Sequence, residues 1–104
     1  MQFCGDKPYG THHFEWDENK NILNVRNHGI AFESALKVFS DRVWVERSDR
    51  KNEERYKAVG LSEGRIITVI FTRRTYGIRI ISARTARKKE KIAYRALFAR
   101  QSAH

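Results

Sequence analysis

The sequence lacks the features of secreted and membrane proteins. Cys4 is the single cysteine among 104 residues, which excludes an intramolecular disulfide and a multi-cysteine zinc site and is typical of a reducing compartment. No apolar run approaches the roughly 18 residues of a membrane-spanning helix, and no signal-peptide pattern follows Met1. We therefore expect a cytoplasmic protein that does not contact a membrane.

Acidic residues are scarce in the second half of the chain. Residues 1–54 hold 8 Lys and Arg against 10 Asp and Glu, a net charge of −2. Residues 55–104 hold 13 Lys and Arg against 2 Asp and Glu, a net charge of +11. This excess indicates contact with nucleic acid or with an acidic protein, although a solvated surface rich in arginine has the same composition.

The length and the hydrophobic content are sufficient for one folded domain. Hydrophobic residues make up 40% of the sequence and aromatic residues 12%, so the chain can form a core and is not a disordered basic tail. We expect residues 1–13 to form a flexible lead and residues 14–101 to form the domain. The spacing of the cysteine and the histidines matches no zinc site, so neither a metal nor a cofactor is expected.

The first part of the domain has the pattern of a short strand and two helices. Residues 14–16 are predicted to form the strand. Asp17 is suited to cap a helix that ends near His28, where Gly29 can adopt a left-handed conformation. An apolar stripe at helical spacing then predicts a second helix, and its members are Phe32, Ala35, Leu36 and Phe39.

The rest of the domain changes to the alternating pattern of strands. We expect four successive strands at residues 43–46, 55–61, 65–73 and 78–83, with a hairpin loop at residues 62–64. A last helix is expected to run from about Thr85 to Arg100. The order β-α-α-β-β-β-β-α with short links between strands predicts an α+β fold, with a mainly antiparallel sheet and the helices on one side of it.

Several segments resemble the BrnT-type toxin family. They are residues 14–20 (FEWDENK), 24–35 (NVRNHGIAFESA), 79–84 (RIISAR) and 87–90 (RKKE), together with Tyr94. The resemblance implies a RelE-like fold and a bacterial type II toxin, an endoribonuclease that cleaves messenger RNA and inhibits translation and growth. It also implies a BrnA-type ribbon-helix-helix antitoxin, which neutralises the toxin and with it represses their operon at operator DNA.

Arg79 and Arg84 are candidate catalytic residues. Cleavage of RNA without metal requires a positioned 2′-hydroxyl, neutralisation of charge on the phosphoryl oxygens, and proton transfer. Arginine suits the second role because its planar guanidinium stays charged and binds two phosphate oxygens. Strand alternation places the two side chains on opposite faces unless a bulge or the strand end reorients Arg84. A salt bridge at the sheet edge is the alternative role for Arg79.

His28 and Lys20 are the candidates in the first predicted helix. Histidine exchanges protons near neutral pH, which suits His28 to proton transfer in catalysis. Capping of the helix C-terminus is the alternative role of this residue. Lys20 lies near the N-terminus of the same helix, where it either contacts phosphate or remains solvated.

A basic cluster at the start of the last predicted helix is a candidate RNA-binding site. Arg87, Lys88 and Lys89 lie where the helix dipole disfavours cations, and a bound phosphate would relieve this conflict. Compensation by Glu90 and solvent is the alternative. Tyr94 is a candidate for stacking on an RNA base, although its position on the apolar stripe of the helix favours packing in the core.

Two other functions are compatible with the sequence. A non-catalytic RNA- or DNA-binding module would bind with a steep salt dependence and leave RNA intact. A structural partner protein would use the basic surface only to bind another protein. Paired glycosidase carboxylates, a Ser-His-Asp order and a glycine-rich phosphate loop are all missing from the sequence.

Overall fold

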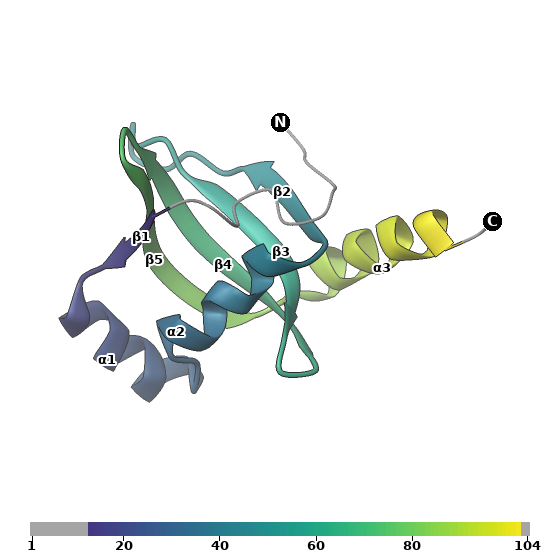
Figure 1. Cartoon of the computed structure of the whole chain (residues 1–104), viewed down its shortest axis with the longest axis horizontal. Helices are drawn as coiled ribbons and strands as arrows, with labels where there is room; N and C mark the ends of the chain where they lie inside the picture. The colour runs from purple at the N-terminus through teal and green to yellow at the C-terminus, as the bar shows by residue number, and fades with distance from the viewer. Residues whose placement is uncertain (1–12, 103–104) are drawn as a thin grey trace.

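The computed structural model describes residues 13–102, which form a five-stranded sheet with helices against both faces (Figure 1). The elements are β1 (His13–Trp16), α1 (Glu18–His28), α2 (Phe32–Ala35), the 3-10 helix η1 (Leu36–Ser40), β2 (Val43–Arg47), β3 (Tyr56–Ser62), β4 (Arg65–Arg74), β5 (Gly77–Thr85) and α3 (Lys88–Ser102). The predicted α+β class and order of elements are confirmed. The predicted lead lies outside the described residues, apart from His13.

The sheet has the strand order β1-β5-β4-β3-β2 and is antiparallel except at one edge. Hairpins join β2, β3, β4 and β5 in succession. The turn between β3 and β4 consists of Glu63 and Gly64, whose φ angles are 51° and 80°, the positive values that a two-residue hairpin turn requires. At the other edge β1 pairs in parallel with β5, so the start of the domain lies beside its last strand.

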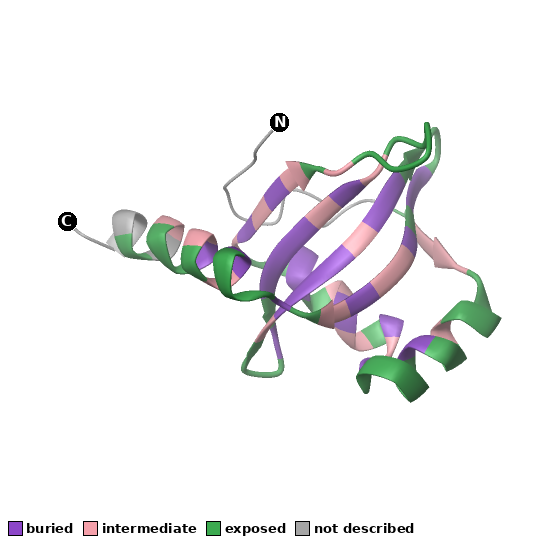
Figure 2. Ribbon diagram, turned by 180° about the vertical axis from the view of Figure 1, so that it is seen from behind, coloured by how far each residue is buried: buried purple, intermediate pink, exposed green. Residues whose placement is uncertain are grey.

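Different helices cover the two faces of the sheet (Figure 2). The face under α2 and η1, here called the core face, carries the main hydrophobic core. The buried residues of this core are Ile30, Phe32, Ala35, Val38, Phe39, Val43, Val45, Tyr56, Ala58, Ile67, Val69, Phe71, Ile78, Ile80 and Ala83. The opposite face, here called the outer face, is covered by α3 in one area only. There Val59, Ala86 and Tyr94 form a second, smaller cluster.

The prediction that all helices lie on one side of the sheet is therefore wrong. Ala86, which precedes α3, and Tyr94 of α3 pack with Val59 and Trp44, which share the outer face because they are paired in adjacent strands. A sheet whose second face carries apolar side chains at one end needs a helix there to remove them from water.

A bulge in β5 decides which of its side chains share a face. Ile70 of β4 is opposite Ser82, whereas the next residue, Phe71, is opposite Ile80. Ile81 is therefore the extra residue, and the alternation of side chains shifts by one at this point. As a result, Ile78, Ile80 and Ala83 all belong to the core face, and both Arg79 and Arg84 lie on the outer face. The sequence left this orientation open.

The ends of α1 follow the predicted capping pattern. The Asp17 carboxylate accepts hydrogen bonds from the backbone N–H groups of Asn19 at 2.8 Å and Lys20 at 3.4 Å. The helix ends at Gly29, whose φ is 70°. Between these ends, the buried Asn24 amide accepts from Ala83 N–H at 3.0 Å and donates to Ala83 C=O at 2.8 Å. The α1 helix thus supplies hydrogen-bond partners for the backbone of β5 at Ala83, beyond the residues of β5 that pair with β1.

The last helix begins later than the sequence suggested. Thr85 is the final residue of β5 and pairs with Ile67, so the prediction that the helix begins there is wrong. Ala86 continues the pairing, since its N–H donates to Ile66 C=O at 3.1 Å. The strand hydrogen bonds therefore delay the start of α3 to Lys88.

Candidate functional site

Basic and hydroxyl side chains gather on the outer face beside the area that α3 covers. The register of the sheet places Lys57, Ile70 and Ser82 in one row across three strands. A pocket of about 230 Å³ opens over part of this row. Its lining residues are Ser48, Arg50, Arg55, Ile70, Ser82, Arg84 and Arg87. Four of the seven are arginines, and we call this site the arginine pocket.

A continuation of the β2–β3 hairpin supplies three of the lining residues. The Ser48 N–H donates to Arg55 C=O at 2.7 Å, and Arg50 and Glu53 exchange two backbone hydrogen bonds of 3.0 and 2.9 Å. The two residues between them have positive φ, as a tight hairpin turn requires. Because side chains alternate along a strand, Ser48 and Arg50 point to the same side, and Arg55 lies opposite Ser48.

The buried carboxylate of Glu90 holds Arg84 in place. The Arg84 guanidinium donates from Nη1 to Glu90 Oε1 at 2.8 Å and from Nη2 to Glu90 Oε2 at 3.0 Å. This carboxylate, in a residue only 4% exposed, also accepts hydrogen bonds from Thr68 Oγ1 at 2.8 Å, Lys57 Nζ at 3.1 Å and the backbone N–H of Arg87 at 2.8 Å. Two paired bonds of this kind fix both the position and the plane of a guanidinium.

The same contacts set the charge of Glu90. Burial raises the pKa of this carboxyl, but the hydrogen bonds from Arg84, from the backbone of Arg87, from Thr68 and from Lys57 outweigh burial and hold the pKa well below its ordinary 4.5. Glu90 is the third residue of α3, and its bond to the N–H that precedes the helix is half of a capping box. It therefore supplies the anion that the helix N-terminus favours.

The predicted cluster at the start of α3 divides into two parts. Arg87, Lys88 and Lys89 are all exposed, and their side chains form no ion pair within the described part of the chain. Arg87 lines the arginine pocket, whereas Lys88 and Lys89 do not. The alternative that the sequence left open, compensation of the helix N-terminus by Glu90, is present, so this helix start does not by itself require a bound phosphate.

Arg79 shares the outer face but belongs to a different site. Its Nε donates to Glu15 Oε2 at 2.9 Å, and Tyr76 Oη donates to the same oxygen at 2.6 Å. The Tyr76 hydroxyl and the Arg79 guanidinium lower the pKa of Glu15 against the opposing effect of burial. Arg79 is five residues from Arg84, about 16 Å along the strand at about 3.3 Å per residue. The salt bridge that the sequence left open for Arg79 is present.

The other predicted site residues lie outside the arginine pocket. Lys20 and His28 are exposed and lie about 12 Å apart along α1, at about 1.5 Å per residue. Tyr94 is 4% exposed, packs in the smaller hydrophobic cluster and donates its hydroxyl to Arg42 C=O at 3.5 Å. Burial raises the pKa of Tyr94. This environment favours its core role, since the ring has no exposed face for a base.

The sequence did not single out Ser48, Arg50, Arg55 and Lys57 as site residues. The first two lie in the link between the strands expected at residues 43–46 and 55–61, and the other two lie in the second of these strands. A signal was available for two of them. Arg55 and Lys57 alternate with the apolar residues Tyr56 and Ala58, which places both side chains on the face away from the core. No comparable pattern marks Ser48 and Arg50, whose position depends on the hairpin pairing.

Within residues 13–102, no three His, Cys, Asp or Glu side chains gather so that they could hold a metal ion. Nor does any helix in the same range have the length and apolar character needed to cross a membrane.

Comparison with known proteins identifies the family. The family model described as "Ribonuclease toxin, BrnT, of type II toxin-antitoxin system" matches residues 16–90. This span includes every lining residue of the arginine pocket and Glu90. A search of curated proteins found no match. Because the match covers most of the chain, the protein belongs to the BrnT family of ribonuclease toxins of type II toxin–antitoxin systems, with RNA as its substrate and an antitoxin as its partner.

Proposed function

We propose that the arginine pocket binds the phosphate at which the toxin cleaves RNA, and that it needs no metal ion. The observation that carries this proposal is the convergence of four arginines in one pocket of about 230 Å³. Guanidinium groups bind phosphate oxygens in pairs and remain charged. Ser48 and Ser82 line the same pocket, and their hydroxyl groups can donate further hydrogen bonds to phosphate.

The proposed reaction uses the 2′-hydroxyl of the substrate as the nucleophile. A bond forms between the 2′-oxygen and the adjacent phosphorus, while the bond from phosphorus to the 5′-oxygen of the next nucleotide breaks. The 2′-hydroxyl releases its proton to solvent, and the departing 5′-oxygen takes one up. The arginines stabilise the charge that develops on the phosphoryl oxygens. The expected products are a 2′,3′-cyclic phosphate and a 5′-hydroxyl.

Arg84 is the central catalytic residue of this proposal. Glu90 engages one N–H of each terminal nitrogen of Arg84, and the Thr85 C=O accepts a third N–H at 3.4 Å. Arginine has five N–H donors in total, so two are free to bind phosphate. Arg87 joins it from the start of α3. Outside the pocket, the basic residues predicted from sequence are proposed to contact flanking RNA: Lys20, His28, Arg79, Lys88 and Lys89.

We further propose that a BrnA-type ribbon-helix-helix antitoxin neutralises the toxin by covering the arginine pocket with an acidic segment. The net charge of +11 on residues 55–104 supports this, because opposite charges direct association. The complex would repress its own operon by binding operator DNA through the antitoxin. Free toxin would cleave messenger RNA in the cytoplasm and so inhibit translation and growth.

Cleavage of a defined messenger by the purified toxin tests the enzymatic proposal. We expect cleavage to persist in EDTA and to produce the two ends named above. Arg50→Ala and Arg87→Ala should each reduce the rate by about 10- to 100-fold, somewhat below the loss caused by removing one oxyanion donor. Arg26→Ala is the matched control, since Arg26 is an exposed arginine on α1.

Each outcome of that assay is informative. Loss of cleavage in EDTA would contradict the metal-free mechanism. RNA that stays intact with and without ribosomes, although it binds tightly at low salt, would favour the non-catalytic binding module. Equal cleavage rates for Arg50→Ala, Arg87→Ala and the control Arg26→Ala would contradict the assignment of the reaction to the arginine pocket.

A further inference from the structure

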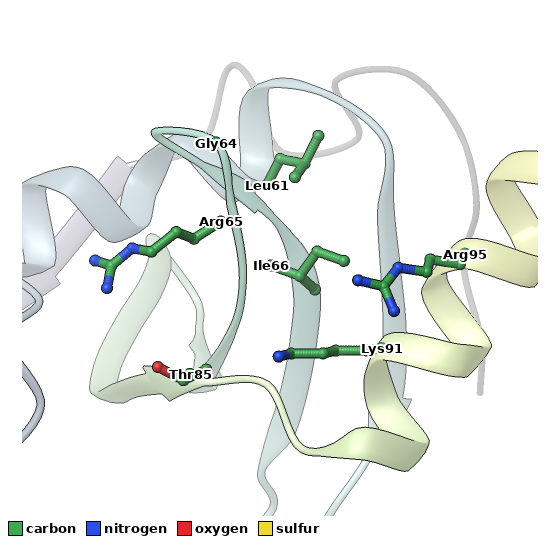
Figure 3. Close-up of a pocket in the computed structure, with 7 residues that line it drawn as sticks. All are labelled: Leu61, Gly64, Arg65, Ile66, Thr85, Lys91 and Arg95. Carbon is green, nitrogen blue, oxygen red and sulfur yellow. The ribbon is translucent and has the colours of Figure 1, made fainter.

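A second basic pocket lies between the β3–β4 hairpin and α3 (Figure 3). Its volume is about 330 Å³, and its lining residues are Leu61, Gly64, Arg65, Ile66, Thr85, Lys91 and Arg95. In Figure 3, Lys91 and Arg95 extend from α3 toward Ile66, whereas the Arg65 side chain points away from the helix. The pocket thus has a cationic wall on α3 and an apolar floor on the sheet.

The cations of this wall are not neutralised by the protein. No carboxylate lines the pocket, and neither Lys91 nor Arg95 forms an ion pair within residues 13–102. The two residues are four apart on one helix, a spacing at which like charges repel and destabilise the helix. An external anion between the two side chains would remove this repulsion.

The apolar floor indicates a ligand with more than a charge. Ile66 is half-buried, and Leu61 is 39% exposed although it is a large hydrophobic residue. A base presents a flat apolar surface, and unpaired bases of RNA stack on apolar side chains and on arginine guanidinium planes. A phosphate against Lys91 and Arg95 with its base over Ile66 would satisfy both parts of the pocket.

The second pocket continues the outer face from the arginine pocket. Ile66 lines the second pocket and Ile70 lines the arginine pocket. Both residues lie on β4, about 13 Å apart at about 3.3 Å per residue. On the neighbouring strand, Arg84 and Thr85 line one pocket each. Between the pockets Thr68 of β4 is buried under Glu90, so a strand of RNA that occupies both pockets passes over the start of α3.

We propose that the pocket formed by Ile66, Lys91 and Arg95 is a binding subsite for a nucleotide of the RNA substrate outside the scissile phosphate. This inference rests on the proposed function of the arginine pocket, and it adds a determinant of substrate length. RNA that reaches both pockets gains affinity from the subsite. RNA too short to reach it is bound by the arginine pocket alone.

The test compares RNA lengths in two double variants. The variant Lys91→Gln/Arg95→Gln removes the cationic wall with side chains that favour helix. The control Arg26→Gln/Lys37→Gln removes the same charge from exposed positions on α1 and η1. Binding is measured with 2′-O-methyl RNA, which lacks the attacking hydroxyl and is therefore not cleaved. Two lengths are compared, a dinucleotide and an oligonucleotide of about eight nucleotides, because single-stranded binding sites span about 4–16 nucleotides.

We expect the subsite variant to bind the longer RNA about 10-fold more weakly than the control does, and to bind the dinucleotide equally. The slope of log affinity against log salt should fall by about 0.7, the contribution of one phosphate contact to a single strand. In cleavage of the longer RNA, KM should rise while kcat stays the same, as loss of uniform binding predicts. Circular dichroism and urea unfolding should confirm that both variants are folded.

Two results would overturn the subsite. One is an equal affinity of both double variants for the longer RNA. The other is weaker binding of an acidic antitoxin peptide with no change for RNA, which would assign the pocket to the antitoxin. Failure of the proposed function is a separate result, because it requires that Arg50→Ala and Arg87→Ala leave the rate of cleavage unchanged.

Discussion

The two faces of the sheet bury different kinds of side chain. On the core face, buried residues are almost entirely apolar and aromatic, as in the contact of Phe71 with Phe39 at 5.3 Å between ring centroids. On the outer face, the most buried charged group is Glu90, which is surrounded by donors. Packing that depends on shape stabilises the fold, whereas a paired and buried charge holds a cation at a defined place.

This comparison shows how one small domain combines stability with a basic site. Burial of a charge is costly unless the charge is paired and hydrogen-bonded. Among the described residues, every buried side-chain nitrogen or oxygen has a hydrogen-bond partner. The outer face therefore positions Arg84 beside the arginine pocket without leaving an unsatisfied polar atom in the interior.

Removal of a core-face aromatic ring should have the largest effect on stability. Phe71→Ala leaves a cavity between Phe39 and Tyr56, whose rings lie 5.3 and 5.4 Å from that of Phe71. We expect the free energy of unfolding to fall by about 3–5 kcal/mol, measured by urea denaturation. RNA cleavage by the folded fraction should be unchanged per molecule. If Phe71→Ala lowered the free energy of unfolding less than Glu90→Gln does, the core face would not be the main source of stability.

Removal of the charge on Glu90 should have the next largest effect. Glu90→Gln keeps the shape of the side chain but weakens its bonds to Arg84 and Lys57. We expect the free energy of unfolding to fall by about 2 kcal/mol, the scale of hydrogen bonds to charged groups. Cleavage should also slow, because Arg84 loses its orientation. The matched control is Glu46→Gln, which removes only the more exposed partner of Lys57.

The stability contributed by Glu90 should disappear in acid. Its pKa in the folded protein is lower than the ordinary 4.5, so the unfolded chain binds a proton before the folded protein does. The contribution is therefore complete above about pH 5 and decreases as the pH falls below 4.5 toward the folded value. Urea unfolding at several pH values should show the difference between wild type and Glu90→Gln shrinking in this range. A constant difference would contradict the pairing.

Replacement of Arg79 should have the smallest effect on stability. Its pair with Glu15 is exposed, and the side chain of Arg79 is 46% accessible, so the loss of this salt bridge should leave the unfolding midpoint nearly unchanged. We expect Arg79→Ala and Arg84→Ala each to relieve growth arrest on expression, Arg84→Ala more strongly because it lies beside Arg87 in the arginine pocket. Full toxicity of both variants would make the catalytic assignment wrong.

Local patterns in the sequence were sufficient to predict most elements of the fold. The carboxylate of Asp17 and the backbone of Gly29 act on their own helix, so both ends of α1 were predictable. Alternation of Val43 and Val45 with Trp44 and Glu46 predicted β2 in the same way. The prediction failed at Thr85, because its strand pairing with Ile67 competes with the helix that follows.

The candidate site was less predictable, because it joins segments that are far apart in the sequence. Arg84 and Arg87 were predicted from chemistry, and the structure places both at the arginine pocket. Arg50 and Arg55 reach the same pocket only through the pairing of the β2–β3 hairpin. The catalytic role of Arg50 is a proposal that Arg50→Ala tests, whereas Arg79 and His28, which the sequence predicted as catalytic residues, are now proposed to contact flanking RNA.

The sequence by itself determined the family, the α+β class and the position of the positive charge, because each of these depends on residue identity or on short-range spacing. Tertiary structure decided which cations act together. One extra residue in β5 brings Arg79 and Arg84 to the same face, and Glu90 then pairs with Arg84 across the start of α3. Both results depend on strand register, which is set by contacts between distant segments and not by any local pattern.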